Sequence, residues 1–225
     1  MQQTRRPASP TAEPAPGLRV HLVQREELAG KVAIVTGGAG GIGHASVLAL
    51  VAEGANVVVA DVDEEAGRAL VAQLGDVAAF HRTDVSDLDQ VRAAVDFAVQ
   101  RFGGLHIMFN NAGVGSDLTR LLDDDLSDFQ RIMNINLFGV IAGSQQAARH
   151  MKDHGGGVII NNASIAAINA GAGMIAYRAS KAAIAHASKC MAIDLAPYRI
   201  RVNCLTPAHI RTGITTYDMG PELKY

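Results

Sequence analysis

An apolar run, a glycine-rich turn and a helical segment follow one another without a break near the start of the chain. Within residues 31–36, Val32–Val35 form a continuous apolar run, which is typical of a strand covered on both faces of a parallel sheet. Residues 37–43 are nearly all glycine, and residues 44–53 then have a helical composition that ends at Gly54. Such a unit presents backbone N–H groups and the positive end of a helix to a phosphate group.

The same alternation of apolar runs and helical segments continues along the rest of the chain. The runs that predict strands are residues 56–60, 77–81, 105–109, 158–160 and 200–205, and the segments that predict helices are residues 64–74, 88–102, 126–152 and 174 onward. Strands that alternate with helices predict an α/β fold, a doubly wound parallel sheet with helices on both faces.

Length and composition limit the classes of protein to be considered. The chain has 225 residues, 48% of them hydrophobic, which is enough for one core in residues 28–225, whereas the Pro/Ala-rich residues 1–27 predict a disordered tail. A net charge of -2 argues against binding to nucleic acid, and no apolar run is long enough to span a membrane. Cys190 and Cys204 lie in apolar segments, so we expect reduced, buried thiols and a cytoplasmic location.

Several polar or glycine-rich segments follow the predicted strands directly, where ligands bind in parallel sheets. They are Gly37–Gly43, Asp61, Asp84–Val85 and Asn110–Gly113. Asp61 is placed to accept hydrogen bonds from an adenosine ribose, and its charge would repel a 2'-phosphate, which favours NAD over NADP. Other roles stay open: Asp61 or Asp63 could cap the next helix, Asp84 could cap a loop, and Asn111 could be a turn residue.

Tyr177 and Lys181 lie four residues apart in a predicted helix, so that they share one face. A neighbouring ammonium favours a tyrosinate, and the pair could therefore exchange protons with a substrate; an ordinary exposed Tyr/Lys pair is the alternative. Asn136 stands among apolar residues and needs hydrogen-bond partners if it is buried. Asp123–Asp125 are consecutive, so they cannot all face one ion, and we predict no metal site.

Taken in order, these motifs resemble the classical short-chain dehydrogenase/reductase family over about residues 28–216. Residues 36–43 are similar to its TGxxxGIG turn, residues 110–113 to its NNAG element and residues 136–139 to its NxxG element. Ser164 and the Tyr177-x-x-x-Lys181 pair occupy the places of the family's serine and YxxxK motif, and residues 207–212 resemble its nicotinamide loop. The resemblance implies a Rossmann-type fold and hydride transfer with NAD.

The resemblance also implies roles for particular residues. Tyr177 would be the acid/base, Lys181 would assist it and hold the nicotinamide ribose, Ser164 would bind the substrate oxygen, and Asn136 would hold a water. The implied cofactor-binding residues are Gly37, Gly41, Ile42, Gly43, Asp61, Val62, Asp84, Val85, Asn111, Ala112, Gly113, Tyr177, Lys181, Pro207, Ile210 and Thr212.

Two features depart from the family pattern. Ala208 replaces the usual glycine after Pro207, and the sequence ends at Tyr225, before the family's substrate-covering helix and last strand. Either the sequence is part of a longer protein or the protein lacks that lid; both interpretations stay open.

The nature of the substrate and of the assembly is less constrained. The apolar segment of residues 165–174 predicts an uncharged alcohol or ketone substrate. Residues 88–102 and 126–152 carry more apolar positions than one helix face would bury, and the resemblance implies pairing through these two helices, so we expect a homo-oligomer, a tetramer or a dimer. A non-catalytic dinucleotide-binding scaffold or sensor is the alternative function.

Overall fold

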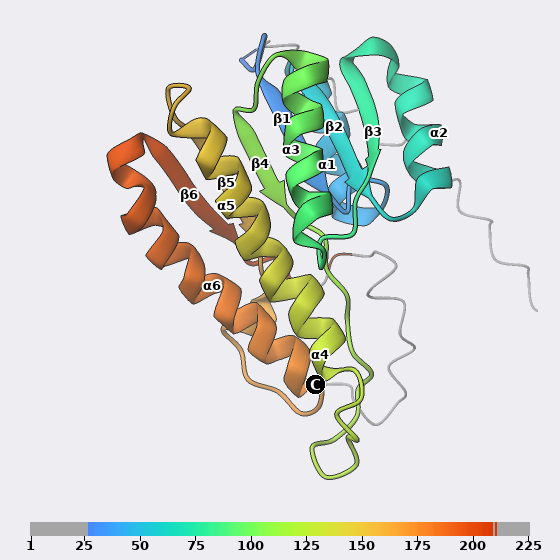
Figure 1. Ribbon diagram of the computed structural model, residues 1–225. Helices are drawn as coiled ribbons and strands as arrows, with labels where there is room; N and C mark the ends of the chain where they lie inside the picture. Colours follow the sequence, from blue (N-terminus) through green and yellow to red (C-terminus); the bar gives the residue numbers. More distant parts are fainter. Residues whose placement is uncertain (1–26, 209, 211–225) are drawn as a thin grey trace, which may run out of the picture.

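Six parallel strands form one sheet in the order β3-β2-β1-β4-β5-β6 (Figure 1). The computed structural model describes residues 27–208 and 210, so the predicted tail, residues 1–27, lies almost entirely outside the described residues. The strands are β1 (Val32–Thr36), β2 (Asn56–Asp61), β3 (Ala78–Arg82), β4 (Ile107–Asn110), β5 (Gly157–Asn162) and β6 (Ile200–Leu205). Each predicted strand is present, displaced by no more than a few residues at its ends.

Helices cover both faces of this sheet, which confirms the predicted doubly wound α/β fold. They are α1 (Gly41–Ala52), α2 (Glu64–Leu74), α3 (Leu88–Phe102), α4 (Phe129–Ile132), α5 (Gly139–Met151) and α6 (Ile175–Leu195). Apolar side chains of α1 and α2 pack on one face of β1 and β2, and those of α3 and α5 pack on the other. In β1 all five residues are buried, as expected for a central strand of a parallel sheet.

The chain reverses the direction in which it adds strands at β1, which pairs with β2 on one side and with β4 on the other. Such a switch point opens a crevice beyond the carboxyl ends of the strands, because the two connecting loops diverge there. The glycine-rich turn after β1 lies in the middle of this edge (Figure 1). The fold therefore places the sequence motifs at one edge of the sheet.

The prediction of one helix from Leu126 to Lys152 was wrong in two respects. The helix begins at Phe129, because Leu126 has a positive φ of 59°, which a helix cannot continue. Between α4 and α5 the chain forms a π-helical segment, Met133–Phe138, that contains Asn136. Such π turns are rare and are often found at functional sites.

The prediction of two buried cysteines was also wrong. Cys190 is exposed on α6, and Cys204 is only half-buried on β6. The buried face of α6 includes the polar residues Ser180, Lys181 and Ser188. The inner face of α6 therefore combines apolar residues such as Ile184 with polar ones, and it does not include Cys190.

Candidate active site

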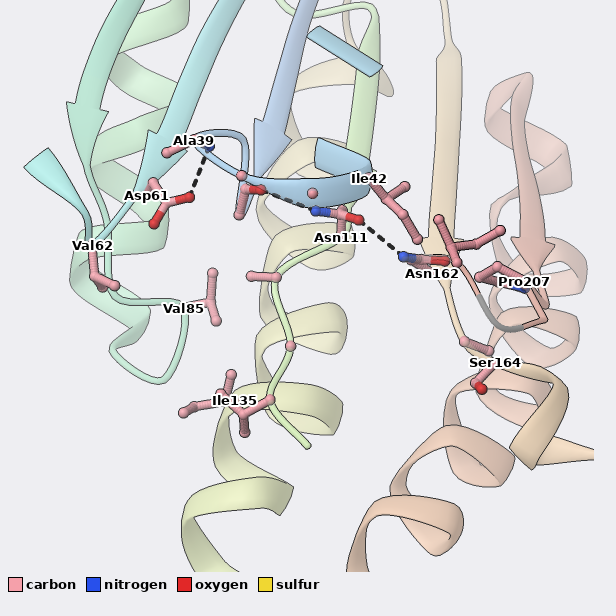
Figure 2. A pocket seen from close by; sticks show the side chains of 18 of the residues that line it. Ala39, Ile42, Asp61, Val62, Val85, Asn111, Ile135, Asn162, Ser164 and Pro207 are labelled. Carbon is pink, nitrogen blue, oxygen red and sulfur yellow. Dashed lines mark hydrogen bonds between the residues drawn. The ribbon is translucent and has the colours of Figure 1, made fainter. Parts of the chain in front are cut away.

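A cleft of about 550 Å³ runs along the carboxyl ends of the strands (Figure 2). Most of the residues that the sequence assigns to a site line it: Gly37, Gly41, Ile42, Asp61, Val62, Asp84, Val85, Asn111, Ala112, Gly113, Ser164, Tyr177, Lys181, Pro207 and Ile210. Gly43 and Asn136 lie behind this lining, and Thr212 lies outside the described residues.

The glycine-rich turn leaves no room for side chains at three of its positions, Gly37, Gly38 and Gly43. A Cβ atom on Gly43 would overlap the carbonyl oxygen of Gly37, and a Cβ on Gly37 would lie 2.9 Å from the Cα of Ala112. Gly37 also has a φ of 62°, a conformation that glycine adopts without strain. The backbone of the turn thus packs directly against other backbone, both its own and that of the segment after β4.

The start of α1 opens into the cleft next to this turn. Gly40 caps the helix without a side-chain hydrogen bond, and a Cβ on Gly40 would meet no atom within 4 Å. The first N–H groups of the helix and its positive end therefore face open space. An anionic group such as a pyrophosphate fits this position.

Asn111 and Thr36 hold the glycine turn in place. The hydroxyl of Thr36 accepts hydrogen bonds from the backbone N–H groups of Asn111 and Ala112, at 2.9 and 3.1 Å. The side-chain amide of Asn111 donates to the carbonyl oxygens of Thr36 and Gly37, at 3.0 and 3.1 Å. Asn111 therefore connects the ends of β1 and β4 and lines the cleft as well.

Asp61 lies at the end of β2 and faces the glycine turn (Figure 2). Its Oδ2 accepts the backbone N–H of Ala39 at 2.9 Å, and its Oδ1 accepts that of Asp63 at 3.0 Å. Asp63, not Asp61, caps α2, since its Oδ1 accepts the N–H of Ala66. Each carboxylate oxygen of Asp61 retains acceptor capacity for a ribose hydroxyl.

The loop after β3 forms the wall of the cleft below Asp61. The Oδ1 atom of Asp84 accepts the N–H and the hydroxyl of Ser86, at 2.9 and 2.6 Å. Asp84 therefore stabilises its own loop and lines the cleft at the same time. Val85 is buried against Gly139, where a Cβ would lie 2.7 Å from the Val85 side chain.

Ser164, Tyr177 and Lys181 meet at the other end of the cleft, where β5 leads toward α6. The hydroxyl oxygen of Ser164 accepts the N–H of Ala166 at 3.1 Å, which leaves its hydrogen free for donation. The Nζ atom of Lys181 lies 5.7 Å from the centre of the Tyr177 ring and donates to the carbonyl oxygen of Asn162 at 2.9 Å. The structure thus brings the three predicted side chains together.

Lys181 is a buried ammonium group, with only 5% of its surface exposed. Burial lowers the pKa of Lys181 to about 8, and an electrostatic contribution from Cys204 opposes this shift only in part. The charged form is disfavoured in a medium that solvates it poorly. Because a pKa near 8 still leaves the group mostly protonated at neutral pH, Lys181 can act there as a cation beside Tyr177.

Asn136 finds its hydrogen-bond partners within the protein. Its Oδ1 accepts the N–H of Val114 at 2.8 Å, and its Nδ2 donates to the carbonyl oxygen of Val114 and to the hydroxyl of Ser180. Ser180 in turn donates to the carbonyl oxygen of Tyr177 at 2.7 Å. Asn136 therefore joins the π-helical segment to the first turns of α6.

Sequence reasoning missed Thr36, Asn162 and Ser180, all of which take part in these contacts. Thr36 and Ser180 lie inside the TGxxxGIG and YxxxK motifs but receive no role of their own from them, and Asn162 lies just after a predicted strand. The apolar segment of residues 165–174, which the sequence assigned to the substrate, does not contribute to the lining of this cleft. Its apolar side chains are instead Ala39, Val114, Ile135, Ala163 and Ala208, besides those named above as lining it.

Within residues 27–208 and 210, no group of three or more His, Cys, Asp or Glu side chains could hold a metal ion. None of the helices that the structure describes is both long and apolar enough to cross a membrane.

Comparison with known proteins identifies the family. Residues 31–220 match the family model for short chain dehydrogenases. Momilactone A synthase of Oryza sativa subsp. japonica is 43% identical over 198 residues, which are 87% of this chain and 72% of that protein. The 3-alpha-(or 20-beta)-hydroxysteroid dehydrogenase of Mycobacterium bovis is 43% identical over 195 residues, 87% of this chain and 74% of that protein.

A solved structure resembles this chain in both fold and sequence. The 3-ketoacyl-(acyl-carrier-protein) reductase from Brucella melitensis, complexed with NADH, superposes with a TM-score of 0.81 at 33% identity, over 84% of this chain and 79% of that one. The fold and the cleft define a nucleotide-binding oxidoreductase of the Rossmann type. The chain belongs to the short-chain dehydrogenase family.

Proposed function

We propose that the protein is an NAD-dependent oxidoreductase that interconverts an uncharged secondary alcohol and its ketone. The juxtaposition of Tyr177 and the buried Lys181 in the cleft carries this proposal. Bound NAD would supply the hydride acceptor, or NADH the donor. The glycine turn and the start of α1 fit its pyrophosphate, and Asp61 fits its adenosine ribose.

At the end of the cleft that holds Ser164, Tyr177 and Lys181, here called the chemical end, each side chain then has a distinct task. Tyr177 exchanges the proton of the substrate oxygen, and the ammonium of Lys181 favours the tyrosinate that results when Tyr177 gives up its proton. Ser164 donates its free hydroxyl hydrogen to the same substrate oxygen. Asn136 positions Tyr177 through Ser180, and its Oδ1 and the Nζ of Lys181 both lie beside Gly113, where a water could join them.

The choice of NAD over NADP rests on the charge of Asp61. A 2'-phosphate at this ribose would meet a carboxylate already bonded to Ala39 and Asp63, and like charges repel. The structural relative complexed with NADH agrees with this choice.

We further propose that the catalytic domain begins near residue 28 and assembles as a homo-oligomer, a tetramer or a dimer. Phe129, Phe138 and Ile141 expose about two fifths of their surface along α4, the π-helical segment and α5, which suits a partner surface. The two free cysteines suit a reducing, cytoplasmic compartment.

The test is NADH formation, followed by absorbance, when the protein is incubated with NAD and a panel of neutral secondary alcohols. Parallel calorimetric titrations with NAD and NADP measure the cofactor preference. NAD binding without turnover of any alcohol or ketone would favour a cofactor-sensing scaffold, and equal affinity for NAD and NADP would reject the role of Asp61.

A further inference from the structure

The hydrogen bonds around Asn111 fix the orientation of its side-chain amide. Its Nδ2 donates to two carbonyl oxygens, those of Thr36 and Gly37, at 3.0 and 3.1 Å. Carbonyl oxygens only accept hydrogen bonds, so the NH₂ group must face the glycine turn. The Oδ1 atom of Asn111 must therefore point the other way, along the edge of the sheet toward β5.

This orientation determines that of a second amide, Asn162. Its Nδ2 donates to the Oδ1 of Asn111 at 2.9 Å, across the ends of β4 and β5 (Figure 2). Because Asn111 offers an acceptor there, the NH₂ group of Asn162 must face it, and the Oδ1 of Asn162 must face away. Figure 2 shows this oxygen on the side of Asn162 opposite Asn111.

The Oδ1 atom of Asn162 is a buried acceptor that finds no hydrogen-bond partner among the residues that the structure describes. The residue exposes only 7% of its surface, yet it lines the cleft. Buried acceptors are nearly always satisfied, because an unpaired one loses its hydration without compensation. A ligand in the cleft that carries an N–H or O–H donor would satisfy it.

Its place in the sheet indicates which part of a dinucleotide it would meet. Asp61 ends β2 and Asn162 ends β5, on opposite sides of the glycine turn that follows β1. The backbone oxygen of Asn162 already accepts the ammonium of Lys181. Asn162 therefore lies between the pyrophosphate position and the chemical end, away from the adenosine ribose.

We propose that Asn162 is a further cofactor-binding residue, whose Oδ1 accepts a hydrogen bond from the nicotinamide half of the dinucleotide. This inference rests on the proposed function. The donor is either a hydroxyl of the nearer ribose or the N–H of the carboxamide. The same side chain thereby links the bound cofactor, through Asn111, to the glycine turn.

Asn110 provides a matched control within the chain. Its Oδ1 is also buried and has no hydrogen-bond partner in the described part of the chain, but Asn110 does not line the cleft. That oxygen faces Gly143, where an added Cβ would overlap it. Asn110→Ala and Asn162→Ala each remove a buried amide, and only the second removes an acceptor from the cleft.

The experiment measures by calorimetry the affinities of the full chain and of both variants for NAD, ADP-ribose and ADP. ADP-ribose lacks the nicotinamide, and ADP also lacks the second ribose. We expect Asn162→Ala to weaken NAD binding by about three- to tenfold, the size of one neutral hydrogen bond, and to leave ADP binding unchanged. Asn110→Ala, once folded, should bind all three ligands as the unaltered protein does.

The arms with the shorter ligands identify the donor. If Asn162→Ala weakens ADP-ribose as much as NAD, the donor is a ribose hydroxyl; if it weakens NAD alone, the donor is the carboxamide. Unchanged NAD affinity in Asn162→Ala, or an equal loss for all three ligands, would overturn the inference. If Asn162→Ala does not fold, Asn162→Ser, which keeps a small polar side chain, replaces it in every arm.

Failure of the proposed function would look different. If the cleft binds no dinucleotide, the unaltered protein itself binds neither NAD nor ADP, and the role of Asn162 is rejected together with the function. If NAD binds without turnover, the function fails, but the binding role of Asn162 is still decided by the titrations.

Discussion

The two ends of the cleft are built from different chemical groups, backbone groups at one end and side chains at the other. At one end, around Gly37–Gly43, the site is made of backbone: glycines packed against carbonyl groups and the open start of α1. At the other end, Ser164, Tyr177 and Lys181 present side chains that carry protons or charge. We therefore expect changes at the first end to alter stability and cofactor affinity, and changes at the second to alter the rate.

Tyr177→Phe should have the largest effect and should separate the two ends most clearly. The ring remains and only the hydroxyl is lost, so turnover should fall by about 10²- to 10⁴-fold while NAD affinity stays nearly unchanged. Steady-state rates with a reactive alcohol and NAD titrations measure the two quantities. Tyr198→Phe, on the exposed turn after α6, is the control and should change neither; near-normal turnover by Tyr177→Phe would reject the assigned proton exchange.

The charge of Lys181 should make the stability of the ligand-free protein depend on pH. The folded protein holds the pKa of Lys181 at about 8, below the ordinary value of 10.5. Between these values the unfolded chain binds more protons, so the free energy of unfolding should rise with pH, by up to about 3 kcal/mol in all. Below pH 8 the full cost of burying the ammonium remains.

Urea unfolding at several pH values, for the unaltered protein and for Lys181→Met, isolates this contribution. Met keeps an unbranched apolar side chain of similar length and carries no charge. The difference in unfolding free energy between the two proteins should change across pH 8 to 10.5, and a constant difference would show that Lys181 is not buried as the structure has it.

Gly43→Ala should damage the backbone-built end. Its Cβ would overlap the carbonyl oxygen of Gly37, and relief of such an overlap shifts the turn, at a cost of about 1–3 kcal/mol in stability. NAD affinity should fall as well. Gly104→Ala is the matched control, because its Cβ would make an ordinary contact, 3.5 Å from His106; thermal unfolding that does not distinguish the two variants would count against the close packing.

Asp61→Ala should alter cofactor preference with a smaller effect on affinity. Removal of the carboxylate eliminates its hydrogen bonds to the ribose of NAD and its repulsion of the 2'-phosphate of NADP. The preference for NAD over NADP should therefore fall by about tenfold. Asp63→Ala removes the cap of α2 and should lower stability by about 1 kcal/mol without a change of preference. Competitive titrations with both cofactors compare the variants, and the same shift in both would point to a general loosening of the loop.

A fall in pH should have the smallest effect on stability, through a histidine at the edge of the sheet opposite the cleft. His106, just before β4, accepts the backbone N–H of Val32 through its Nδ1 at 3.0 Å, and burial lowers its pKa, with a further contribution from Lys31. A lowered histidine pKa means that stability is present above the unfolded value of about 6.5 and is lost as pH falls below it.

Protonation of His106 removes the acceptor, which is worth about 1 kcal/mol. Urea unfolding at pH 7.5 and 5.5, with His106→Gln for comparison, measures this loss. A smaller acid dependence in the variant is expected, and an identical one would assign the loss to other groups; His81 and His150 also have pKa values lowered by burial.

The helix α6 shows how a sequence pattern can identify a site and still misjudge its surroundings. The spacing of Tyr177 and Lys181 correctly predicts that both side chains face one side of the helix, since that depends on local geometry alone. The pattern does not show that Lys181 is buried or that Cys190 is exposed. Those outcomes depend on β5 and β6, which pack against the helix.

The segment around Asn136 shows a second limit. Its apolar neighbours predict a helix, and a helical segment is present, but the π-helical hydrogen bonding of Met133–Phe138 is not visible in the composition. Asn136 is held there by Val114 and Ser180, which lie 22 and 44 residues away. Contacts between such distant residues have no local sequence signal.

The amino-acid sequence is sufficient to predict the α/β alternation, the glycine turn and the edge of the sheet where the motifs lie. Each follows from local periodicity or from residues that only a tight turn accommodates. The direction of the Asn162 amide, which Asn111 sets from 51 residues away, and the burial of Lys181 depend on how the strands and helices pack. Donors and acceptors are paired through space, so their orientation is fixed only when the strands and helices have packed.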